Sequence, residues 1–189
     1  MSPTVHTQLG CHPRPSRRSL LLETGGLVAG ALIASGAEAG QASSKGLVLG
    51  PNDGEHLIQR GGNIFIKADP TKGSADLALG TQQVLAGVGI PIHRHLRMEE
   101  AFYVIGGTGT LILDDVPHPI EQGATIFIPK NTWHGFQNPE RELNLLWIVA
   151  PPGLEAFFRE VATRPGERPV SRSKDEINAI ARRYDTEFR

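Results

Sequence analysis

Short apolar runs broken by turn residues fill the chain between residues 45 and 150. The breaks carry glycine, proline, asparagine and aspartate, as at Gly61-Gly62 and Asp114-Asp115. Many short strands at this spacing are typical of a β-sandwich or a β-barrel. We therefore predict an all-β domain over 45–150. Its clearest strands are expected at 46–49, 63–67, 82–86, 100–105, 110–113, 125–128 and 143–149.

The hydrophobic period changes after Pro152-Gly153. Apolar residues then recur at helical spacing, which predicts a short amphipathic helix over 154–163. Further along, Ser173 lies three residues before Glu176, and this is the spacing of a capping box. We expect that box to begin a second helix over 174–184, so that 151–189 forms a helical extension of the β-domain.

The first 39 residues are typical of a bacterial export signal. Arg17 and Arg18 precede a mildly apolar run, and Ala37-Glu38-Ala39 offers small side chains at both positions of an A-x-A cleavage site. The paired arginines resemble a twin-arginine signal. We therefore expect a signal peptide over 1–39, a linker over 40–44, and a periplasmic or secreted protein.

A membrane anchor is the alternative for this segment. The apolar run is far shorter than the roughly 20 residues that cross a bilayer, so we expect no stable anchor. Cys11 is the only cysteine in the chain, and it lies in the part that export would remove. The exported protein would then have neither disulfide bonds nor thiolate metal ligands.

Composition narrows the function classes further. Apolar residues make up 39% of the 189 residues and charged residues 21%, which is typical of a globular protein and excludes general disorder. The formal net charge is −1, with both signs interspersed. A nucleic-acid-binding protein would carry a basic patch, so we expect no nucleic-acid partner.

One group of polar residues in the β-domain indicates a metal site. Residues two apart in a strand face the same side, so His93 and His95 project together. Glu100 shares its face with the apolar residues 102 and 104, whereas the rival carboxylate, Glu99, lies out of phase with them. With His134 these side chains form a mixed nitrogen and oxygen ligand set, which suits Fe, Mn, Ni, Cu or Zn as a divalent ion.

The spacing of these residues resembles the two motifs of the cupin superfamily. The first, G-x5-H-x-H-x3,4-E-x6-G, is present in full from Gly87 to Gly107. The second, G-x5-P-x-G-x2-H-x3-N, runs from Gly123 to Asn138, with Asn131 in place of the middle glycine. Asparagine tolerates the left-handed conformation better than other non-glycine residues, so the turn should form.

The resemblance implies a fold, a cofactor and a ligand set. The fold would be the cupin double-stranded β-helix, a jelly-roll barrel, followed here by short C-terminal helices. The cofactor would be one divalent transition metal, and an octahedral ion with four protein ligands would keep two positions for dioxygen or substrate. The ligands implied by the family are His93, His95, Glu100 and His134.

The residues around the ligands suggest the chemistry. An apolar wall beside a metal fits oxidation of a small aromatic or enolic substrate, with Glu100 as the catalytic proton acceptor. This loosely resembles the small quercetin 2,3-dioxygenase-like cupins. Two alternatives stay open: a non-catalytic cupin that binds a metal or a small molecule, and a cupin isomerase or decarboxylase. A homodimer also stays open. The expected pocket residues are Phe102, Val104, Trp133, Phe136 and Gln83.

Overall fold

The computed structural model describes residues 45–138 and 140–189. The predicted signal peptide and linker, with Cys11, Arg17 and Arg18, lie outside the described residues. The strands are β1 (Glu55–Gln59), β2 (Gly62–Ala68), β3 (Ala78–Val84), β4 (Ile90–His95), β5 (Glu99–Leu113), β6 (Val116–Glu121), β7 (Thr125–Ile128), β8 (His134–Gln137), β9 (Leu143–Ala150) and β10 (Thr186–Phe188). The helices are a 3-10 turn, η1 (Pro70–Lys72), then α1 (Leu154–Val161) and α2 (Lys174–Arg183).

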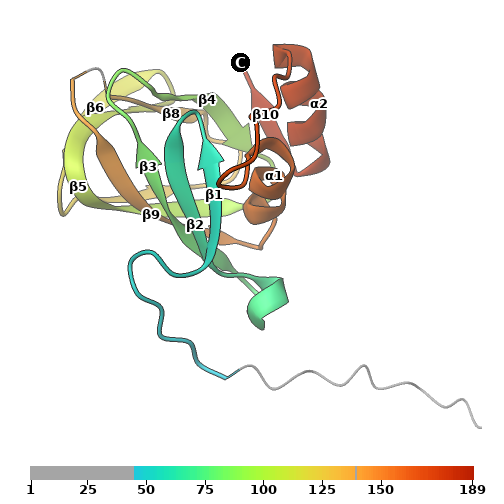
Figure 1. Ribbon diagram of the computed structural model, residues 1–189. Helices are drawn as coiled ribbons and strands as arrows, with labels where there is room; N and C mark the ends of the chain where they lie inside the picture. Colours follow the sequence, from blue (N-terminus) through green and yellow to red (C-terminus); the bar gives the residue numbers. More distant parts are fainter. Residues whose placement is uncertain (1–44, 139) are drawn as a thin grey trace, which may run out of the picture. The chain divides into compact units, whose positions relative to one another are not determined.

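Two antiparallel sheets share the long strand β5, which confirms the all-β prediction (Figure 1). The first part of β5 pairs with β9 and β7, and through β9 the sheet continues to β3, β2 and β1. The second part of β5 pairs with β6 and β8, and through β8 the other sheet continues to β4 and β10. The fold is a jelly roll in which β5 passes from one sheet to the other.

The core fills the space between the two sheets. Alternation along β9 sends Leu143, Leu145, Trp147 and Val149 inward, each with 0% exposure. Their apolar surface is removed from water against the inward residues of β2 and β5. Because burial contributes roughly 25 cal/mol per Å² of apolar surface, this core is the main source of stability of the barrel.

Two tight turns depend on unusual backbone conformations. Asn131 has a φ of 64°, which is the left-handed conformation expected from the substitution in the second motif. Gly107 has a φ of 88°, and a Cβ atom there would lie 1.9 Å from the carbonyl oxygen of Glu142. Glycine is therefore required at position 107 for β5 and β9 to stay paired.

The prediction of a strand over 46–49 is wrong. This segment pairs with no strand, and Val48 is fully exposed. An apolar run forms a strand only where it can pair and bury one face, and here the chain has not yet reached the sheet.

Strand β6 forms in spite of Pro117 and Pro119, because it lies at a sheet edge where missing N–H donors are tolerated.

Both predicted helices are present, and they lie beside β10 at one end of the barrel (Figure 1). The capping box is confirmed, since the Ser173 hydroxyl accepts from the Glu176 N–H and the Glu176 carboxylate accepts from the Ser173 N–H. Helix α1 is tied to the first sheet by Arg159, which donates to Glu55 and Asp69. In the described residues, no helix is both long and apolar enough to cross a membrane.

Candidate metal centre

Three strands bring four donor side chains to one place inside the barrel. Alternation along β4 sends His93 and His95 inward together, and β8 pairs with β4 so that His134 lies directly opposite His93. Glu100 enters from the start of β5, while Glu99 beside it is exposed. The four residues are all buried, and one donor atom from each lies within 4.8 Å of the others.

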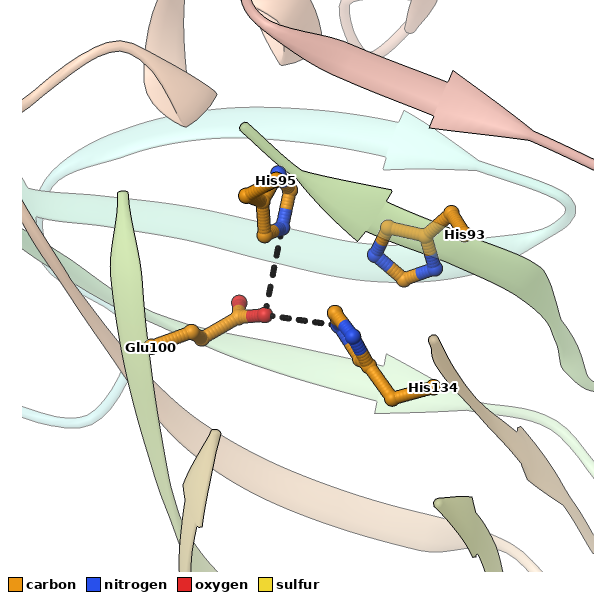
Figure 2. Close-up of side chains that lie close together, drawn as sticks. All are labelled: His93, His95, Glu100 and His134. Atoms are coloured by element: carbon orange, nitrogen blue, oxygen red, sulfur yellow. Dashed lines mark hydrogen bonds and ion pairs between the residues drawn. The ribbon is translucent and has the colours of Figure 1, made fainter. Parts of the chain in front are cut away.

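The carboxylate of Glu100 lies close to two imidazoles (Figure 2). Its Oε2 atom is 3.0 Å from Nε2 of His134 and 3.2 Å from Nε2 of His95. The third ring, His93, lies beside His134 with the two ring centroids 4.1 Å apart. Adjacent ligands of a six-coordinate ion with bonds of about 2.1 Å are themselves about 3.0 Å apart, so this spacing suits a metal ion.

Hydrogen bonds to backbone carbonyls fix two of the rings. Nδ1 of His93 lies 2.9 Å from the carbonyl oxygen of Pro91, and Nδ1 of His134 lies 3.0 Å from that of Thr132. A carbonyl can only accept, so each Nδ1 carries the hydrogen and each Nε2 keeps a free lone pair in the neutral ring. This tautomer is the one that lets Nε2 bind a metal.

The donor atoms fit a divalent cation better than they fit one another. The lone pairs of His134 Nε2 and Glu100 Oε2 face each other at 3.0 Å, and two acceptors repel at that distance unless a cation lies between them. Nε2 of His95 is buried and has no hydrogen-bond partner. One metal ion would satisfy all these atoms at once, which a single proton cannot do.

Burial and neighbouring charges set the protonation of the site. Burial lowers the pKa of His93 well below its ordinary value, and the nearby His134 and His95 lower it further. Burial alone would raise the pKa of Glu100, but the adjacent His134 and His95 rings outweigh it and lower the pKa well below its usual range. A neutral His93 and an ionised Glu100 are the forms that bind metal.

A narrow cavity of about 30 Å³ opens beside the cluster. His93 and Glu100 form one side of it, and Phe102, Phe157 and Phe188 form apolar walls. Its other polar residues are Gln59, Arg60 and Gln82, on the first sheet and on the turn between β1 and β2, and Thr186 on β10. The cavity therefore joins the donor cluster to a mainly aromatic space with a polar side.

The predicted pocket residues divide into two groups. Phe102 lines the cavity. Phe136 packs against the ring of Phe102, with the two ring centroids 5.0 Å apart. Val104 is fully buried in the core, beyond the cavity. These three side chains point inward, as the alternation along β5 and β8 requires.

Gln83 and Trp133 require correction, because both point away from the cavity. Gln83 bonds Asn63 and Glu142 on the outer face of the first sheet, and Gln82 is the residue that reaches the cavity. Trp133 precedes the inward His134 by one residue, so alternation turns it outward. The guanidinium groups of Arg94 and Arg189 both lie over its ring, at 4.6 and 4.5 Å from the ring centroid.

Sequence reasoning missed the contribution of the C-terminal strand. Nδ1 of His95 lies 2.9 Å from the hydroxyl oxygen of Thr186. The ring of Phe188 stacks on His93, with centroids 5.4 Å apart. Neither residue belongs to a motif. The strand that carries them, β10, has only three residues, so the sequence shows no alternating pattern there, and it forms by pairing with β4.

Comparisons with known proteins agree with this fold and site. The chain matches the cupin domain model over residues 80–151. It is 36% identical over 95 residues to protein SchB of Streptomyces halstedii, an alignment that covers 49% of this chain and 69% of SchB. This chain therefore belongs to the cupin superfamily, and its buried His/Glu cluster is a candidate metal site of that superfamily.

Solved structures show the same fold. The polyketide cyclase RemF from Streptomyces resistomycificus aligns with a TM-score of 0.53 and 22% identity, covering 71% of this chain and 92% of RemF. An RmlC-like cupin from Shewanella frigidimarina aligns with a TM-score of 0.51 and 18% identity, covering 60% of this chain and 96% of that protein. At these identities the likeness establishes the jelly-roll fold, which many activities share.

Proposed function

We propose that this protein is a metal-dependent oxidoreductase of the dioxygenase type that acts on a small aromatic or enolic substrate. The observation that carries the proposal is that His93 and Glu100 belong both to the buried donor cluster and to the wall of an aromatic cavity. A ligand in that cavity would touch the metal site directly. In dioxygenation both atoms of dioxygen enter the product, so dioxygen itself is the oxidant.

The donor set suits Fe, Mn, Ni, Cu or Zn, held by His93, His95, Glu100 and His134. A divalent ion bound there would supply Lewis-acid chemistry to a substrate oxygen. Glu100 is the residue placed to accept the proton of a substrate hydroxyl or enol. Because its pKa is held low, it accepts that proton only from a group whose own acidity has been raised in the site.

The apolar walls orient the substrate and keep water away. Phe102, Phe157 and Phe188 present aromatic surface to the cavity, which favours a flat, unsaturated ligand. Arg60 also lines the cavity, and its guanidinium is surrounded by enough protein for burial to lower its pKa, although an arginine stays protonated. A cation there would attract an enolate, phenolate or carboxylate group and hold it with charge-assisted hydrogen bonds.

The test is oxygen consumption by protein loaded with each of the five metals in turn. The substrates would be catechols, flavonols and enolisable β-diketones; the last are included because RemF, which shares the fold, is named as a polyketide cyclase. The proposal expects uptake of one dioxygen per substrate consumed, and loss of that uptake in His95→Ala. Conversion without oxygen uptake would contradict oxidation and support an isomerase or decarboxylase.

A non-catalytic cupin is the second outcome of the same experiment. Micromolar binding of one of these substrates, with no conversion under any metal, would contradict the enzyme proposal and support a binding protein. The cavity, at about 30 Å³, holds about one water molecule, so both the binding and the conversion of an aromatic ligand require it to open further. Hydrogen exchange at α1 and β10, with and without ligand, would measure such an opening.

We also propose export through the twin-arginine route. The proposal rests on Arg17-Arg18, the mild apolar run and the A-x-A pattern at 37–39. That route carries folded proteins, as the resemblance implies, so the metal would be bound before export. This matters for a nitrogen and oxygen site, because copper and zinc outcompete iron and manganese wherever they are freely available.

A further inference from the structure

The last strand of the chain lies against the strand that carries two of the donor histidines. β10 pairs with β4 in antiparallel register, which places Thr186 opposite His95 and Phe188 opposite His93. Residues directly opposite in an antiparallel pair project to the same face. Two C-terminal side chains therefore lie on the inner face beside the metal ligands, and Thr186 is 1% exposed.

The hydroxyl of Thr186 has only one orientation that satisfies its neighbours. Its oxygen lies 3.1 Å from the carbonyl oxygen of Tyr184 and 2.9 Å from Nδ1 of His95. The carbonyl can only accept, so the single hydroxyl hydrogen points to Tyr184. The lone pair then faces His95, whose Nδ1 must carry a hydrogen to donate to it.

We propose that Thr186 is a positioning residue of the metal centre, one that fixes the tautomer and the ring orientation of His95. With the hydrogen held on Nδ1, Nε2 keeps its lone pair and points into the donor cluster, where it has no hydrogen-bond partner. The inference rests on the proposed metal function. Backbone carbonyls do the same for His93 and His134, so His95 is the ring whose tautomer depends on a side chain.

Ion pairs on the outer side of β10 hold the hydroxyl in place. Arg94 bonds Glu187 and Arg97 bonds Asp185, each with an N–O distance of 2.6 Å. These two pairs flank Thr186 in the sequence. They fix the register of β10 on β4, and a strand that slipped by one residue would turn Thr186 away from His95.

Two substitutions separate the hydroxyl from the shape of the side chain. Thr186→Val keeps the volume and removes the hydrogen-bond acceptor, so Co²⁺ affinity measured by calorimetry should fall about 10- to 100-fold. Thr186→Ser keeps the hydroxyl and should stay within about threefold of the original affinity. Thr125→Val, an exposed change on β7, is the matched control and should have no effect.

Side-chain nitrogen NMR of the metal-free protein gives an independent readout. In the unchanged protein the hydrogen of His95 should reside on Nδ1. In Thr186→Val it should move to Nε2, which lies 3.2 Å from a Glu100 oxygen that can accept it. Circular dichroism and thermal melting would establish that both variants fold.

Each result supports or overturns the inference. Unchanged Co²⁺ affinity in Thr186→Val, or an equal loss in Thr186→Ser, would overturn the role of the hydroxyl. So would a His95 ring that keeps its hydrogen on Nδ1 in Thr186→Val. If the unchanged protein binds no Co²⁺, the proposed metal function fails by itself, and the NMR measurement still decides whether Thr186 sets the tautomer.

Discussion

Glu100 Oε2 lies 3.0 Å from Nε2 of His134, and the hydrogen bond from His134 to the Thr132 carbonyl leaves that nitrogen with a lone pair. The pair is thus arranged for a cation and not for a direct hydrogen bond between neutral groups. Both atoms are buried, so water cannot relieve the repulsion. This relationship leads to a prediction about stability as well as about metal binding.

Glu100→Gln should abolish metal binding and keep or raise the melting temperature of the metal-free protein. The amide N–H can donate to the bare nitrogen of His134, which replaces a repulsive contact with a hydrogen bond worth about 1 kcal/mol. Glu99→Gln is the matched control, because Glu99 is the exposed neighbour on the same strand. Calorimetric metal titration and thermal melting test this, and a Glu100→Gln protein that still binds metal tightly would contradict the ligand assignment.

Arg60→Ala should weaken the binding of anionic substrates. If the guanidinium in the cavity wall holds an enolate or carboxylate, its loss should raise KM about tenfold, or about 1.4 kcal/mol, and leave kcat nearly unchanged. Neutral substrates of the same size should respond much less. Arg168→Ala, in the exposed loop between the helices, is the control. An equal effect on charged and neutral substrates would show that Arg60 is not a charge-recognition residue.

The anchor between β2 and α1 predicts a pH-dependent contribution to stability. The Asp69 side chain is fully buried and accepts from the Thr71 hydroxyl at 2.7 Å and from Arg159. Burial alone would raise its pKa, but these hydrogen bonds outweigh it and hold the pKa of Asp69 below its ordinary 3.8. A carboxylate with a lowered pKa stabilises the folded state above its ordinary pKa, and that stabilisation is lost as the pH falls.

Asp69→Asn should therefore lower the free energy of unfolding by about 2 kcal/mol at neutral pH. The gap between the two proteins should narrow as the pH falls below 3.8. Urea titrations at several pH values measure the difference, and the exposed Asp76→Asn serves as the control. A gap that stays constant across this range would mean that the Asp69 charge does not stabilise the fold.

Replacing Arg17 and Arg18 together by lysine should block export and leave the precursor in the cytoplasm with its metal bound. Lysine keeps the charge and removes the planar guanidinium, so the change tests the motif and not the charge. Rerouting residues 40–189 through the general secretory pathway should shift the bound metal towards copper or zinc. Normal export of the double-lysine protein would contradict the twin-arginine assignment.

Periodicity predicted the inward face of β5 because the apolar residues there are unambiguous. Glu100 shares the parity of Phe102 and Val104, and it is buried while Glu99 is exposed. The same test applied to β3 would have selected Gln82, which shares the parity of Val84, over Gln83. In β3 the two glutamines are adjacent and chemically identical, so their own side chains do not indicate which one points inward. Only the buried apolar residues of the same strand distinguish the inner face from the outer face.

The contribution of β10 could not be predicted from local sequence. Thr186 bonds a residue 91 positions earlier, and β10 is a three-residue strand that exists because β4 offers it a free edge. Such a strand carries too few residues for a periodic pattern. Trp133 illustrates a related limit: an aromatic residue beside a ligand suggests a pocket wall, yet alternation and two arginines hold it on the outer surface.

The central claim is that one divalent metal ion is held by His93, His95, Glu100 and His134. Elemental analysis of the protein purified from its native compartment, in parallel with His95→Ala, tests it most directly. We predict about one transition-metal ion per chain in the unchanged protein and less than about a tenth of that in the variant, with the circular dichroism spectrum preserved because the core does not depend on the metal. Equal metal content in the two proteins, or none in either, would contradict the claim.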